Sequence, residues 1–133
     1  MKKNVILLFG SMFILALFAF VTKKAQEPWP VPDKYKNMAN PVASDDASID
    51  KGKALWTQHC QSCHGKKGKG DGPKAAQLDT ECGDFSKKAF QSQPDGALFY
   101  KTSEGRKDMP SYKKKIPEAN DIWSLVNFMR TLK

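Results

Sequence analysis

The sequence has few cysteines, no internal repeat and no run in which polar and apolar residues alternate. Its three cysteines are an odd number, so a framework of intrachain disulfides cannot use all of them. The lack of alternation predicts little or no β-sheet. No nucleic-acid-binding motif is present, which argues against a nucleic-acid partner despite a net charge of +8.

Charge is also missing from residues 5–21, which follow a basic start and form an apolar run of seventeen residues. Such a run indicates an export signal or a membrane anchor. No alanine near its end completes an A-x-A-like cleavage site. Lys23 and Lys24 follow at once, and lysines often flank an apolar helix that is retained in the membrane. An uncleaved anchor is therefore favoured over a cleaved signal, and both remain open. No cysteine follows the run, which argues against a lipid anchor. Removing residues 1–22 takes away two lysines and no acid, which lowers the net charge from +8 to +6.

Beyond this segment, the sequence divides into a spacer at 23–47 and a folded domain at 48–133. Four of the eight prolines lie in the spacer, which favours an extended, semi-rigid segment, although Trp29 and Tyr35 could instead dock on the domain.

The domain shows helical signals only. We expect one helix from an N-cap at Asp46 or Ser48 into Cys60, a second at 94–105, and a third from Pro117 with an apolar stripe. An all-α fold of three to four short helices has a small core. Such domains are usually stabilised by disulfides, a metal or a buried cofactor.

The stretch HCQSCHG, at 59–65, holds both histidines and two of the three cysteines. Its C-x-x-C-H pattern is the attachment signature of c-type haem. Cys60 and Cys63 can form thioethers with the two vinyl groups, and His64 is then placed to ligate the iron. A thioredoxin-like dithiol lacks the strand–helix context that it needs. A zinc site of Cys60, Cys63, His64 and Cys82 has enough ligands but lacks a second spaced pair.

The five methionines are the candidates for a second axial ligand of the iron. Met1 and Met12 belong to the apolar segment, Met38 to the spacer, and Met129 to the core stripe of the last helix. Met109 lies in a loop between two expected helices and is followed by Pro110. A thioether at this place would complete a six-coordinate iron and raise its reduction potential. The alternative is that Met109 only fills a gap in the core.

These residues together resemble class I cytochromes c, most closely the bacterial membrane-anchored monohaem type. The resemblance covers about residues 48–133. It implies the small cytochrome c fold around one covalent haem c, with the last helix crossing the first at Gly52 and Trp56 packed beside Leu125 and Phe128. It also implies that the carbonyl of Pro73 accepts a hydrogen bond from the His64 ring.

The resulting hypothesis is an electron carrier and not an enzyme, shuttling single electrons between respiratory-chain components on the periplasmic side of the cytoplasmic membrane. It would be anchored by residues 5–21, or released into the periplasm if that segment is cleaved, and no small-molecule substrate is expected. The alternatives are a cytochrome c subunit of a larger complex such as a terminal oxidase, and a haem enzyme or gas sensor with a labile Met109. Cys82 is expected to be a small buried hydrophobe, and His59 a surface residue near the haem edge. Lysines flank the haem-bearing loops and suit acidic redox partners, at positions 66, 67, 69, 113, 114 and 115.

Overall fold

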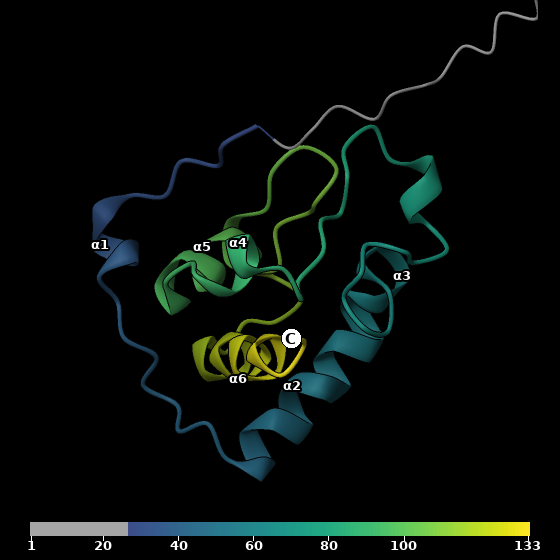
Figure 1. Cartoon of the computed structure of the whole chain (residues 1–133). Coiled ribbons are helices and arrows are strands. Elements are labelled where there is room, and N and C mark those ends of the chain that lie inside the picture. The colour runs from purple at the N-terminus through teal and green to yellow at the C-terminus, as the bar shows by residue number, and fades with distance from the viewer. Residues whose placement is uncertain (1–26) are drawn as a thin grey trace, which may run out of the picture.

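The computed structural model describes residues 27–133 (Figure 1). These residues form six α-helices and one 3-10 helix, and they contain no β-strand. The apolar segment 5–21 lies outside the described residues. The longer helices are α2 (Asp46–His59), α5 (Asp95–Glu104) and α6 (Ala119–Arg130). Single helical turns are α1 (Asp33–Lys36), α3 (Gln61–His64), α4 (Lys88–Gln91) and the 3-10 turn η1 (Ala75–Gln77). The all-α prediction is confirmed, and its three main helices are the three longer ones.

Helix α2 begins with a capping box between Asp45 and Ser48. Asp45 is the N-cap, and its carboxylate accepts a hydrogen bond from the Ser48 amide at 2.8 Å. The Ser48 hydroxyl in turn accepts from the Asp45 amide at 3.2 Å. Reciprocal bonds of this kind satisfy amides that the first helical turn leaves without partners. The cap is therefore Asp45, and neither Asp46 nor Ser48 as the sequence suggested.

The core lies where α2 crosses α6, the most extensive contact between helices (Figure 1). A Cβ atom built on Gly52 would lie 2.1 Å from the Ser124 carbonyl oxygen and 2.8 Å from the Phe128 Cβ. Only glycine allows so close a crossing. One turn later, the Trp56 ring lies 5.8 Å from the Phe128 ring. Residues 122–129 of α6 are all buried, so this helix is covered on every side along two turns.

Residues 27–43, which we call the strap, run along the outside of the domain (Figure 1). The Tyr35 and Tyr100 rings lie 4.7 Å apart, which places the strap on α5. The Asn40 amide donates to Asn127 Oδ1 at 2.7 Å, which ties it to α6. The sequence left two possibilities for this segment, a free spacer or a segment docked through Trp29 and Tyr35, and these contacts place the strap on the domain. Within residues 27–133, no helix has both the length and the apolar character that crossing a bilayer requires.

Candidate functional site

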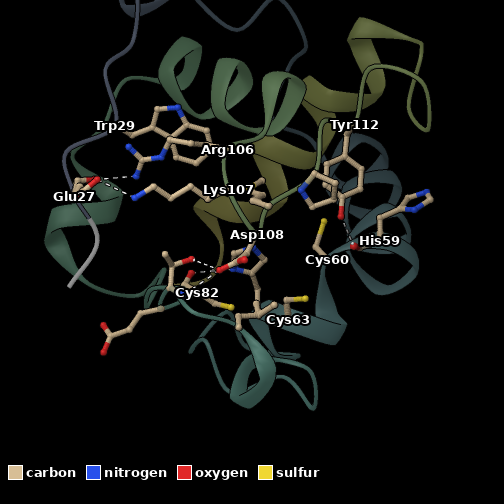
Figure 2. A pocket seen from close by; sticks show the side chains of 16 residues that line it. Glu27, Trp29, His59, Cys60, Cys63, Cys82, Arg106, Lys107, Asp108 and Tyr112 are labelled. Atoms are coloured by element: carbon tan, nitrogen blue, oxygen red, sulfur yellow. Dashed lines mark hydrogen bonds and ion pairs between the residues drawn. The ribbon is translucent and has the colours of Figure 1, made fainter. Parts of the chain in front are cut away.

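The two motif cysteines lie at a junction between helices. Cys60 ends α2 and precedes the single turn α3, whose His64 amide donates to the Cys60 carbonyl at 2.9 Å. Cys60 is buried and Cys63 is half-buried, and they form no disulfide with each other. Both line a cavity that also contains His64, Met109 and Tyr112, which we call the thiol cavity (Figure 2). The short turn thus presents both sulfurs to one hollow.

The environment of Cys60 does not suit a redox dithiol. Burial, together with the neighbouring Cys63, raises the pKa of the Cys60 thiol to about 12. Reactive dithiols need a thiolate, which forms where the pKa is lowered. A zinc site is also disfavoured, because no three His, Cys, Asp or Glu side chains in residues 27–133 are arranged to hold a metal ion. Of the three interpretations of the motif, haem attachment is the one that the geometry supports.

The His64 ring is fixed by a backbone carbonyl. Its Nδ1 lies 3.0 Å from the Cys82 carbonyl oxygen, and because a carbonyl can only accept, Nδ1 carries the proton. The Nε2 lone pair is then available to a metal. Burial lowers the pKa of His64, the largest effect on this group, so the imidazole is held neutral. A neutral ring with a fixed tautomer is what an axial ligand requires.

The family resemblance gave this role to the carbonyl of Pro73, whereas in the structure the bond is made by the carbonyl of Cys82. The loop after the motif folds back on α3, where the Gly72 amide donates to Cys63 at 3.2 Å and the Lys74 amide to Ser62 at 2.8 Å. These bonds hold Pro73, which is exposed, against the backbone of α3. The later segment through Cys82 approaches His64 instead. A backbone carbonyl leaves no side-chain signature, so the sequence offered no signal for Cys82 in this role.

Met109 lies in a short loop at residues 105–110, which we call the Met109 loop. The Arg106 and Met109 backbones exchange two hydrogen bonds, of 2.8 and 3.0 Å. Gly105 has a φ of +69°, and a Cβ there would lie 2.4 Å from the Pro110 carbonyl carbon. Asp108 accepts hydrogen bonds from the Thr80 hydroxyl at 2.8 Å and from the Thr80 amide at 3.0 Å. The loop is thereby joined to the segment that leads to Cys82.

A second cavity of about 570 Å³ adjoins the thiol cavity. The two share seven lining residues, which include Cys60, His64 and Met109. Several of the residues that line it are aromatic or aliphatic, and we call it the aromatic cavity. These residues are Trp56, Phe85, Phe90, Leu98 and Met129. Its volume falls within the range of roughly 300–1,000 Å³ that cofactor and ligand sites occupy.

The residues present fit a haem group. Cys60, the neutral imidazole of His64 and the thioether of Met109 line both cavities, and Cys63 lines the thiol cavity. The imidazole has one nitrogen available. Cys60, Cys63, His64 and Met109 are therefore brought together, whereas Pro73 lies outside both cavities. Met129 also lines the aromatic cavity but is fixed on the buried face of α6.

Two further residues complete the rim of the thiol cavity. The Tyr112 hydroxyl donates to the His59 carbonyl at 2.8 Å, and the two rings lie 5.9 Å apart (Figure 2). Burial raises the pKa of Tyr112 to about 12. His59 is half-buried at this rim. Tyr112, which the sequence did not single out, joins the loop after Met109 to the end of α2.

This constellation defines a haem protein of the c type. A family model described as cytochrome C oxidase, cbb3-type, subunit III matches residues 47–129, more than half of the chain. The chain belongs to this cytochrome c family, which implies a covalently bound haem c and an electron-transfer role. The resemblance to class I cytochromes c is confirmed.

Solved structures share the fold. A chain of the Kuenenia stuttgartiensis reducing HAO-like protein complex superposes with a TM-score of 0.64 at 24% identity, over 80% of this chain and 51% of that one. This protein thus spans about half the length of that chain. The c-type cytochrome KustC0563 superposes with a TM-score of 0.53 at 25% identity, over 62% of this chain and 96% of that one. No curated protein matches the sequence.

Proposed function

We propose that this protein carries single electrons between respiratory proteins outside the cytoplasmic membrane. Cys60 and Cys63 would hold the haem through thioethers, and His64 and Met109 would ligate its iron. The observation that carries the proposal is that both ligand side chains line the same two cavities as Cys60. With His64 and Met109 both as ligands, the chain would leave no coordination site on the iron for a substrate.

The chain's own residues set the conditions for this chemistry. The bound haem supplies an iron that cycles between two oxidation states. His64 stays neutral and oriented through Cys82, Met109 supplies a soft thioether that favours the reduced state, and the apolar walls keep water away. Because few groups need to move or change protonation, an electron can enter and leave with little rearrangement.

The proposed location rests on the apolar run at 5–21, which would anchor the chain or direct its export. In bacterial cells that express the full chain, protease added to spheroplasts should digest the domain, whereas in intact cells the domain should survive. Survival in spheroplasts, with digestion only after lysis, would place it in the cytoplasm and contradict this location.

The proposed docking partner is an acidic redox protein. Among the lysines near the site, Lys69 pairs with Asp84 at 3.5 Å and Lys113 with Glu104 at 2.6 Å. Lys66, Lys67 and Lys114 are exposed and form no ion pair within residues 27–133. Such unpaired charges steer association with a partner of opposite sign.

A second candidate is a subunit of a terminal oxidase, because the matching family model carries that description. Mild detergent extraction of the full chain separates the two candidates. A free carrier should purify alone and show one single-electron transition in a redox titration, and the reduced protein should bind little carbon monoxide. Constant co-purification with oxidase subunits would favour the second candidate. Ready carbon monoxide binding would instead indicate a haem enzyme or gas sensor with a labile Met109.

A further inference from the structure

The beginning of the strap is bonded to the Met109 loop. Arg106 donates from Nη1 to the Pro28 carbonyl and from Nη2 to the Glu27 carbonyl, both at 2.9 Å. Lys107 forms an ion pair with the Glu27 carboxylate, also at 2.9 Å. Two successive residues of the loop, two and three positions before Met109, are therefore held by two successive residues of the strap (Figure 2).

Trp29 extends this contact into the wall of the site. The guanidinium carbon of Arg106 lies 4.7 Å from the centre of the indole, and Lys101 Nζ lies 5.7 Å from it. Both distances are within the range of cation–π attraction. Trp29 is half-buried and lines both cavities. The indole thus packs on the side chain that anchors the loop and closes the same hollow.

The rest of the strap gives these contacts a fixed base. Asn40 is bonded to Asn127 and to the Trp123 carbonyl of α6, and Tyr35 packs on Tyr100 of α5. A segment fixed at one end to the helical core can hold a loop at its other end. Residues 27–29 also lie outside the region matched by the family model, so this support is added to the cytochrome domain.

We propose that Glu27 and Trp29 are positioning residues for Met109. Residues 27–29 hold the Met109 loop in place through Arg106 and Lys107, and they close the cavity wall beside it. The inference rests on the proposed ligation of the iron by Met109. An external ligand such as carbon monoxide can bind only after Met109 leaves, so its apparent affinity scales with the fraction of molecules in which the loop is open.

The test uses the full-length protein with its haem. We expect Glu27→Gln to raise the apparent carbon monoxide affinity of the reduced protein about two- to fivefold. We expect Trp29→Ala to raise it about tenfold, because both the cation–π contact and the wall are lost. Hydrogen exchange at the Met109 amide, which donates to Arg106, should accelerate by similar factors.

A matched control is Asp33→Asn, which removes another exposed ion pair of 2.9 Å in the same strap, with Lys36. This pair lies outside both cavities, so the control should leave affinity and exchange unchanged. The exchanged pair, Glu27→Lys with Lys107→Glu, should restore both properties toward the original values. Rescue would show that the charge pairing itself acts on Met109, and not a general loosening of the fold.

Unchanged affinity and exchange in both Glu27→Gln and Trp29→Ala would overturn the proposal, as would equal effects from Asp33→Asn or no rescue by the exchanged pair. Met109→Ala separates this failure from that of the proposed function. If Met109→Ala raises the affinity strongly while the strap variants do nothing, Met109 is the ligand and the strap does not position it. If Met109→Ala has no effect, the proposed ligand set fails and this inference fails with it.

Discussion

At the scale of single residues, Gly52 shows how one missing side chain determines the core. Glycine in a helix normally costs stability relative to alanine, by about 0.5–1 kcal/mol. Here the absent Cβ lets the backbone of α2 approach the Ser124 carbonyl of α6. The sequence predicts this crossing from the family resemblance, and the structure confirms it.

Gly52→Ala should therefore destabilise the protein, although the same change in an open helix would stabilise it. We expect a loss of about 1–3 kcal/mol in the free energy of unfolding, because α2 and α6 must separate to admit a methyl group. Urea unfolding followed by circular dichroism measures this loss. Lys53→Ala, at the adjacent exposed position, is the control and should change stability by less than about 0.5 kcal/mol. Equal stabilities for Gly52→Ala and the parent would contradict the close crossing.

Tyr112 gives the protein a pH dependence in the alkaline range. Its pKa is raised from 10.0 to about 12 in the folded chain, so the unfolded chain loses this proton first. The stability that the neutral Tyr112 phenol contributes is fully present below pH 10, the pKa in the unfolded chain. It is lost as the pH rises through the pKa of Tyr112 in the folded chain. In Tyr112→Phe, the stability should fall less between about pH 8 and about pH 11 than in the parent. Parallel declines in the two proteins would show that the phenol does not contribute.

The residues of the site differ in how well the sequence predicts them. Cys60, Cys63 and His64 form a fixed local pattern, and Met109 is the methionine left in a loop, so their convergence on one hollow could be expected. The partner of His64 could not, because the Cys82 carbonyl acts through its backbone, and every residue has a carbonyl. The rim contact of Tyr112 depends on the path of a loop, which periodicity does not describe.

At the scale of elements, the strap is the segment for which the sequence left two possibilities open. Alternating prolines favour an extended segment, and outside α1 the strap contains neither helix nor strand. Extension alone does not say whether a segment is free or docked. Docking depends on Asn127, which is buried in α6 and bonds to the strap through Asn40, Val42 and Ala43. An asparagine between Val126 and Phe128, beside the apolar stripe of the last helix, was the available signal for this contact.

Asn127→Ala should detach part of the strap. The substitution leaves the Val42 and Ala43 carbonyls without this donor, and we expect a loss of about 1–3 kcal/mol in the free energy of unfolding. Amide exchange within residues 33–43 should accelerate more than exchange in α2. The same substitution at exposed Asn120 is the control, with an expected change below about 0.5 kcal/mol. Unaltered exchange in the strap would mean that Asn127 does not hold it.

At the scale of the whole molecule, the helices form a core where α2 crosses α6 and leave a large hollow beside it. The three longer helices could be predicted because periodicity and caps are local signals. The single turns α1, α3 and α4 are too short to show a period, and tertiary contacts position them. A small domain with an apolar cavity of about 570 Å³ gains much of its stability from whatever fills that cavity.

Removing the thioether anchors should therefore loosen the whole domain. We expect the double variant Cys60→Ser with Cys63→Ser, purified without haem, to keep much of its helical signal but to lose fixed tertiary packing. Near-ultraviolet circular dichroism and binding of a hydrophobic dye would report this state. Cys82→Ser is the control and should keep both haem and packing, because its contact with His64 is made by the backbone. A double variant with native tertiary signals would show that the cavity needs no cofactor.

The optical spectrum of the oxidised, full-length protein tests the assigned site most directly. The parent should show covalently bound haem and the weak far-red band of methionine ligation. In Met109→Ala, the haem should stay attached and the band should disappear, whereas in Met129→Leu, which changes the other methionine lining the cavity, the band should remain. A band that survives in Met109→Ala, or a parent without covalent haem, would contradict the assignment.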